Sequence, residues 1–160
     1  MNTVLVGMGD YKVSRVPDAL MTIGLGSCLG VCVYDQMAKV AGMAHIMLPS
    51  SRDMPQSNPL KYADTCLSIM MSEINRLGGV SSRLKAKVAG GAQMFAALGK
   101  ASAMHIGEKN MDAVSEELKK YGIPILAKDV GGNVGRTITF RIETSELYIK
   151  TAKSSNGKVI

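Results

Sequence analysis

The sequence predicts one α+β domain, a sandwich with a mixed, largely antiparallel β-sheet core and flanking helices. The chain has 160 residues, which suits a single domain, because domains commonly hold about 100–150 residues. Short apolar runs separated by Gly, Pro and Asp dominate the first half, as expected of strands joined by turns. Two longer segments carry apolar residues three and four positions apart, the spacing of an amphipathic helix.

Eight strands are expected from the short apolar runs. They cover residues 3–6, 20–23, 29–34, 40–48, 84–89, 124–128, 136–143 and 146–150. Runs of this length, bounded by turn residues, are typical of strands rather than helices. The predicted domain spans residues 1–150, and residues 151–160 are interpreted as a polar C-terminal tail.

Two helices are expected from the longer periodic segments. Residues 62–77 end at Gly78-Gly79, which is a common C-terminal stop. Asn110 is a candidate N-cap for a second helix over residues 111–121, and Gly122 follows that helix. Helices and strands therefore mix along one chain, which defines the predicted fold class.

Composition excludes several classes of function. No apolar run approaches the roughly 18 residues that span a bilayer, and the first residues lack an export signal, so we expect a cytoplasmic protein without membrane insertion. The net charge is +6, which favours an acidic partner. The chain has no Trp and no dense Lys/Arg run, so nucleic-acid binding is not expected.

The three cysteines match neither a zinc motif nor a secreted disulfide framework. Cys28, Cys32 and Cys66 are an odd number with irregular spacing. We therefore expect free thiols, no metal site and no cofactor. Cys32 and Cys66 lie in apolar periodic segments and are expected in the core, whereas His105 is expected in a surface loop.

Cys28 stands in the most informative segment, Gly24-Leu-Gly-Ser-Cys-Leu-Gly30. Three glycines let the backbone turn closely and keep its amides accessible. The segment is similar to a nucleophile elbow, but that motif needs a helix directly after the nucleophile. Residues 31–34 indicate a strand instead, so an α/β-hydrolase is not expected.

The hairpin formed by residues 29–34 and 40–48 brings His45 toward Cys28. If residues 35–38 form a four-residue loop, Tyr34 faces Lys39 and Cys28 lies opposite His45. A five-residue loop would place His45 on the other face of the sheet unless a bulge corrects it.

A cysteine next to a histidine suits nucleophilic catalysis. The imidazole of His45 can take the proton of Cys28 and hold the thiolate as an ion pair, so the thiol is expected to ionise below its ordinary pKa. Such a base needs a third group to orient its ring. Thr22 offers a hydroxyl six residues before the cysteine, but other neighbours qualify equally.

These residues closely resemble the CheD family of chemoreceptor glutamine deamidases. The resemblance covers about residues 3–150 and is carried by six segments in order. They are Thr-Ile-Gly-Leu-Gly-Ser-Cys-Leu-Gly-Val (residues 22–31), Gly-Met-Ala-His-Ile-Met-Leu-Pro (42–49), Lys-Tyr-Ala-Asp (61–64), Ala-Gly-Gly-Ala-Gln-Met-Phe (89–95), His-Ile-Gly-Glu-Lys-Asn (105–110) and Asp-Val-Gly-Gly-Asn-Val-Gly-Arg (129–136).

The resemblance implies a catalytic triad of Cys28, His45 and Thr22. It implies protein-glutamine glutaminase activity, in which side-chain amides of glutamines on methyl-accepting chemoreceptors become glutamate and ammonia. It also implies a fold like that of cysteine-dependent toxin deamidases. The expected partners besides the receptors are the CheC phosphatase and, indirectly, phosphorylated CheY.

Less specific expectations concern the surroundings of the cysteine. Ser27 and Gly26, with the amide of Cys28, are candidates for the turn that holds an oxyanion. Met94 and Phe95 follow a glycine pair, and they could bind a partner or pack under a loop with similar odds.

Two other functions stay open at the level of sequence. The protein could be a regulatory binding module that acts on CheC and receptors without turnover. A peptidase could use the same triad, because amide chemistry does not distinguish main-chain from side-chain amides.

Overall fold

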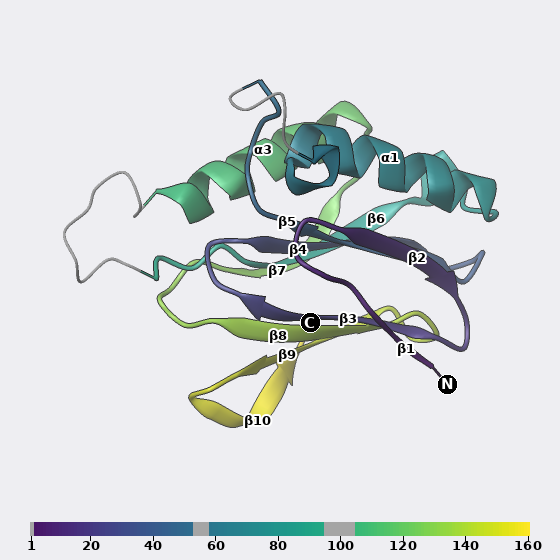
Figure 1. Cartoon of the computed structure of the whole chain (residues 1–160). Helices are drawn as coiled ribbons and strands as arrows, with labels where there is room; N and C mark the ends of the chain where they lie inside the picture. The colour runs from purple at the N-terminus through teal and green to yellow at the C-terminus, as the bar shows by residue number, and fades with distance from the viewer. Residues whose placement is uncertain (1, 53–57, 95–104) are drawn as a thin grey trace.

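The computed structural model describes residues 2–52, 58–94 and 105–160. Three layers are stacked in it, with two helices above one sheet and a second sheet below (Figure 1). The strands are β1 (Thr3–Leu5), β2 (Tyr11–Arg15), β3 (Ala19–Leu25), β4 (Leu29–Asp35), β5 (Val40–Ile46), β6 (Lys85–Gly90), β7 (Ile125–Val130), β8 (Arg136–Arg141), β9 (Glu146–Thr151) and β10 (Ser154–Val159). The helices are α1 (Ala63–Arg76) and α3 (Ile106–Lys120), with short 3₁₀ turns η1 (Pro59–Lys61) and η2 (Ser81–Arg83).

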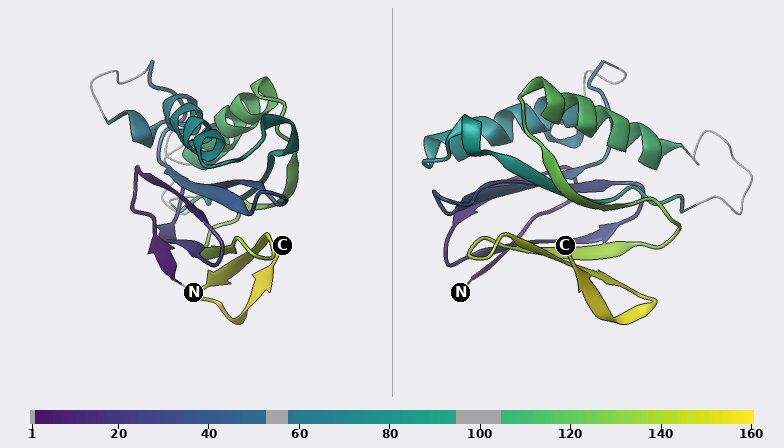
Figure 2. Two further views of the ribbon diagram at one scale, coloured as in Figure 1. Left: turned by 90° about the vertical axis from the view of Figure 1, so that its right-hand side faces the viewer. Right: turned by 180° about the vertical axis from the view of Figure 1, so that it is seen from behind.

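Both sheets have five strands and mixed direction. Sheet 1 has the order β1-β3-β8-β9-β10, and sheet 2 has the order β2-β5-β4-β6-β7. Only the pairs β1–β3 and β6–β7 are parallel among the described strands, so both sheets are largely antiparallel. Figure 2 shows α1 and α3 together over the outer face of sheet 2. The predicted α+β sandwich with flanking helices is confirmed.

Strands β4 and β5 form the centre of the molecule and are buried along their whole length. Side chains alternate between the faces of a strand. Val31 and Val33 therefore pack toward the helices, and Cys32 and Tyr34 pack toward sheet 1. Two apolar cores result, which explains why these strands are continuous apolar runs.

Three expectations about elements are corrected. The presumed polar tail contains β10, which pairs with β9 at the edge of sheet 1. Strand β2 was not expected because its short sequence Tyr-Lys-Val-Ser-Arg lies at a sheet edge and contains no continuous apolar run. The second helix begins at Ile106 rather than after Asn110, because Asn110 is buried by tertiary contacts and does not cap the helix.

The register of the β4–β5 hairpin also differs from the prediction. Asp35 pairs with Val40, and Gly30 rather than Cys28 lies opposite His45. The loop still has four residues, but they are 36–39, because Asp35 accepts hydrogen bonds from the N–H groups of Met37 and Ala38 inside the turn. The shift is two positions, so His45 keeps the predicted face of the sheet.

None of the described helices has the length and apolar character needed to cross a bilayer.

Candidate active site

Thr22 and His45 meet between the two sheets. Thr22 lies on β3 of sheet 1 and His45 on β5 of sheet 2, and both are fully buried. Their Oγ1 and Nδ1 atoms are 2.7 Å apart. The Thr22 hydroxyl also donates to the carbonyl of Val6 at 2.8 Å. Because a hydroxyl has a single hydrogen, its oxygen must accept from Nδ1–H of His45.

This arrangement fixes the tautomer of His45. With the proton on Nδ1, the neutral ring has an unprotonated Nε2 that can accept a proton. Nε2 is buried and has no hydrogen-bond partner in the described part of the chain. Burial also lowers the pKa of His45 below 6.5, because desolvation disfavours the imidazolium. His45 is therefore a neutral base with its reactive nitrogen unengaged.

Cys28 lies in the bend between β3 and β4, half-buried against the core between the sheets. Burial raises the pKa of its thiol above 9.0, and the backbone N–H of Cys28 opposes this shift only in part. The thiol and Nε2 of His45 form no hydrogen bond with each other. The expected low pKa and preformed ion pair are thus not found, because both groups are desolvated and the neutral pair is favoured.

The glycine pair at the end of β6, Gly90-Gly91, holds the loop that carries Cys28. The N–H of Gly91 donates to the carbonyl of Cys28 at 2.9 Å, and the N–H of Ala92 donates to that of Gly26 at 2.8 Å. Gly90 has a φ of +115°, and a Cβ there would lie 2.4 Å from the carbonyl oxygen of Cys28. Only glycine allows this approach of the two backbones.

Asn110 joins the cysteine loop to the histidine strand from the helix layer. Its Nδ2 donates to the carbonyl of Ser27 at 3.0 Å and to that of Met47 at 3.1 Å. Sequence reasoning assigned Asn110 to a cap and assigned Gly90 no role. The Gly-Gly pair directly after a strand was the available signal for Gly90, whereas tertiary bonds such as those of Asn110 leave no local pattern.

The turn residues Gly26 and Ser27 leave donors available. Their carbonyls are engaged by Ala92 and Asn110. The N–H of Ser27 has no backbone acceptor within residues 2–52, 58–94 and 105–160, and the N–H of Cys28 lies against its own thiol. Two adjacent N–H groups beside a thiol, neither of them held by another backbone carbonyl, are suited to an oxyanion-binding turn.

Met94 adjoins this turn. Its Cγ lies 3.1 Å from the position that a Cβ on Gly26 would take, and the side chain is 46% exposed. Phe95, the other residue expected at a partner surface, lies outside the described residues.

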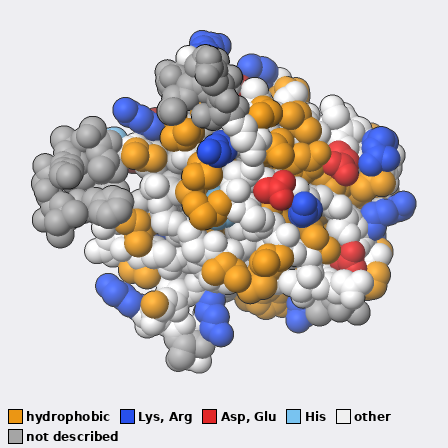
Figure 3. All heavy atoms as spheres, viewed as in Figure 1, with side chains coloured by type: hydrophobic (Ala, Val, Ile, Leu, Met, Phe, Trp, Pro, Cys, Tyr) orange, Lys and Arg blue, Asp and Glu red, His pale blue; other side chains and the backbone are white. Residues whose placement is uncertain are grey.

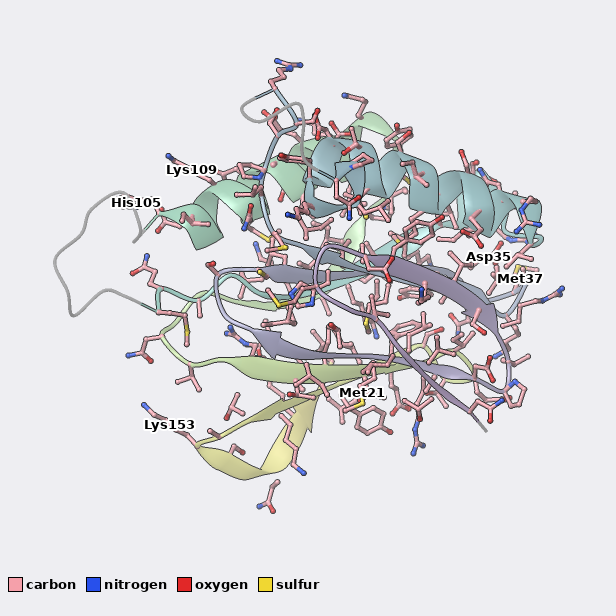
Figure 4. The ribbon with its side chains drawn as sticks, viewed as in Figure 1. Met21, Asp35, Met37, His105, Lys109 and Lys153 are labelled. Carbon is pink, nitrogen blue, oxygen red and sulfur yellow. The ribbon has the colours of Figure 1, made fainter. Side chains whose placement is uncertain are left out.

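The other cysteines and His105 lie where the sequence predicts. Cys32 and Cys66 are fully buried, and burial raises the pKa of Cys66 to about 12. His105 precedes α3 at the surface, beside Lys109 (Figure 4). No group of three or more potential metal ligands occurs among the residues described. On the face seen in Figure 3, Lys and Arg side chains are dispersed rather than gathered in one patch.

The site has the residue set of cysteine-dependent hydrolases: a half-buried cysteine in a glycine loop, a buried neutral histidine and a hydroxyl that orients the histidine. Comparison with known proteins identifies the family. The family model described as CheD chemotactic sensory transduction matches residues 47–151. The chain belongs to the CheD family.

Curated relatives match nearly the whole chain. A probable chemoreceptor glutamine deamidase CheD from Desulfitobacterium hafniense is 53% identical over 150 residues, covering 94% of each chain. The chemoreceptor glutamine deamidase CheD of Halalkalibacterium halodurans is 48% identical over 162 residues, covering 99% of this chain and 100% of its own. Among solved structures, a Neisseria meningitidis protein of family model DUF152 aligns with a TM-score of 0.47 and 11% identity, covering 83% of this chain and 63% of its own.

Proposed function

We propose that this chain is a protein-glutamine glutaminase that converts glutamine side chains of methyl-accepting chemoreceptors to glutamate and ammonia. Family membership supports the reaction, because full-length relatives at about half identity are named chemoreceptor glutamine deamidases. The observation that carries the proposal is the hydrogen bond from His45 to Thr22. This bond leaves Nε2 of His45 as a free base. His45 lies on β5 opposite Gly30 of β4, and Gly30 is two residues after Cys28.

In the proposed mechanism, Cys28 attacks the carbon of the glutamine carboxamide. Nε2 of His45 takes the thiol proton as the C–S bond forms, since the neutral pair is favoured before substrate binds. The N–H groups of Ser27 and Cys28 stabilise the resulting oxyanion. His45 then returns its proton to the departing nitrogen, and ammonia leaves a thioester on Cys28.

The second half of the reaction reverses these roles. His45 removes a proton from water, and the hydroxide attacks the thioester carbonyl. The same turn stabilises the second oxyanion. Collapse expels the Cys28 thiolate, which recovers its proton from His45, and the receptor glutamate is released. Thr22 holds the ring of His45 in place throughout. Its hydroxyl oxygen accepts from Nδ1–H of His45, and this bond stabilises the imidazolium in both halves of the reaction.

The location and partners belong to the same proposal. Action on the signalling parts of receptors places the protein in the cytoplasm. Met94, which adjoins the cysteine turn, would contact the receptor or the CheC phosphatase, as would Phe95, with phosphorylated CheY acting indirectly. Competition between receptor and CheC for one surface would make CheC an inhibitor of deamidation.

Intact-mass analysis of a receptor fragment tests the function. Incubation with the wild-type chain should release ammonia and raise the fragment mass by the difference between oxygen and NH for each glutamine converted. Cys28→Ala and His45→Ala should each abolish both signals. Cys66→Ala is the matched control: it removes a buried thiol on α1, in the core between the helices and sheet 2, so it should keep the rate per folded molecule.

The same spectra separate the alternatives. A peptidase would give shorter fragments, whereas a deamidase leaves the chain intact. A regulatory module would bind the fragment without changing its mass. Ammonia release by Cys28→Ala at the wild-type rate would refute the assignment of the nucleophile.

A further inference from the structure

Asn110 is the polar side chain that connects the two halves of the site. It lies on α3 and is fully buried. Its amide nitrogen donates both hydrogens, one to the carbonyl of Ser27 and one to the carbonyl of Met47. Ser27 directly precedes Cys28, and Met47 comes two residues after His45. A single amide group thus holds the nucleophile loop and the histidine segment at a fixed separation.

The oxygen of the same amide indicates that Asn110 is not optimised for stability. Oδ1 is buried and has no partner among the described residues. A buried polar atom without a hydrogen bond typically costs about 1–3 kcal/mol. A residue with this cost calls for another explanation, and the two donated bonds at the site provide one.

Helix α3 is a firm support for this side chain. Gly107, in its first turn, packs on the backbone of Gly91, where a Cβ on Gly107 would lie 2.4 Å from the Gly91 oxygen. Gly91 in turn donates its N–H to the carbonyl of Cys28. The helix therefore contacts the cysteine loop through both backbone and side chain, and cannot shift without moving that loop.

We propose that Asn110 is a positioning residue for deamidation, an inference that rests on the proposed function. It sets the distance and angle between the thiol of Cys28 and Nε2 of His45. Cys28 and His45 form no hydrogen bond of their own, so their approach depends on the frame that holds them. Small displacements of reacting groups, about 1 Å, can reduce a rate by about 100-fold.

Two substitutions test this role in the full-length chain. Asn110→Ser is neutral and small, and its single hydroxyl can bond only one of the two carbonyls. Asn110→Asp keeps the shape but, when ionised, offers no hydrogen to either carbonyl. With the receptor fragment as substrate, kcat should fall at least about 10-fold in Asn110→Ser, and further in Asn110→Asp. KM should stay unchanged, because the side chain of Asn110 is fully buried and is not accessible to a substrate.

The pH dependence of Asn110→Asp separates positioning from a general loss of structure. Protonation restores one hydrogen for donation, so kcat per folded molecule should rise, relative to wild type at the same pH, as pH falls. A residue that only stabilised the fold would change the folded fraction and leave kcat per folded molecule unaltered. Circular dichroism at each pH gives the folded fraction.

Asn75 on α1 provides the matched control. It is exposed, and its side chain accepts from the Ser81 hydroxyl at 3.5 Å. Asn75→Ser and Asn75→Asp should keep wild-type kcat at every pH. If Asn110→Ser has the wild-type kcat, the inference about Asn110 is wrong, but the proposed function is not affected. Absence of ammonia release by the wild-type chain would overturn the proposed function, and the inference with it. If Asn110→Asp does not fold at neutral pH, the Asn110→Ser result decides.

Discussion

At the scale of single residues, the Thr22 hydroxyl decides which nitrogen of His45 is basic. It donates to Val6 and accepts from Nδ1–H. Thr22→Val keeps the shape and removes both bonds, so the ring loses its orientation and its fixed tautomer. We expect kcat to fall roughly 10- to 100-fold, part of the 10²–10⁴-fold that a general base contributes. The free energy of unfolding should fall by about 1–3 kcal/mol.

Thr22→Ser is the companion variant, since it keeps the hydroxyl and should retain most of the activity. Ammonia release and thermal unfolding, measured on the same preparations, separate the two effects. Wild-type kcat in Thr22→Val would show that the orientation of His45 does not depend on this hydroxyl.

The residues of the candidate site differ in how well sequence reveals them. Cys28 is conspicuous because glycines surround it, and the hairpin argument placed His45 on the correct face although the register was two positions off. Thr22 could not be chosen from spacing, because its contact with His45 joins two sheets. The bonds of Asn110 likewise form only after α3 packs on the sheet, so no local pattern encodes them.

At the scale of elements, the end of β6 shapes the cysteine loop through Gly90. Gly90→Ala would place a Cβ 2.4 Å from the carbonyl oxygen of Cys28 at a φ of +115°. Backbone strain at such a φ costs about 1–3 kcal/mol, and the collision adds about 1–3 kcal/mol. Because the atom that must move belongs to the nucleophile, we also expect a loss of kcat.

Gly78→Ala isolates the collision from the strain. Gly78 has a φ of +110°, and a Cβ there would meet nothing within 4 Å. Chemical denaturation should show a smaller loss of stability for this variant, and deamidation per folded molecule should stay at the wild-type rate. Equal effects of the two substitutions on both measurements would contradict a special role for Gly90.

Elements themselves were largely predictable, for physical reasons that also explain the exceptions. The central strands β4 and β5 are buried on both faces, so their sequences are continuous apolar runs that mark them clearly. Edge strands β2 and β10 carry polar residues because one edge and one face are less covered. Their pairing with β5 and β9 supplies the order that their composition does not indicate.

At the scale of the whole molecule, the site lies at one end of the sandwich, and an ionic cluster around Asp35 lies at the other. Strand β4 runs from Leu29, next to Cys28, to Asp35, and Figure 4 shows Asp35 and Met37 far from His105 at the start of α3. Asp35 accepts hydrogen bonds from Arg83 and from the N–H of Val80, which ties the hairpin to the segment after α1. Catalysis and fold stability can therefore be perturbed separately.

The acid stability of the molecule should depend on Asp35. Burial alone would raise its pKa, but hydrogen bonds from Arg83 and from the N–H groups of Ala38 and Val80 lower the pKa to about 2. An unfolded aspartate has a pKa of about 3.9, so the ionised form contributes about 2 kcal/mol to folding above that pH. This contribution is lost as pH falls from about 4 toward 2.

In Asp35→Asn, stability at pH 7 should be lower by a similar amount and should vary less across this range. Urea denaturation at several pH values measures the difference, with Asp112→Asn on the exposed face of α3 as control. Parallel stability curves for wild type and Asp35→Asn between pH 5 and 2 would contradict the assignment, and unchanged kcat in Asp35→Asn at pH 7 would show that the two ends act independently.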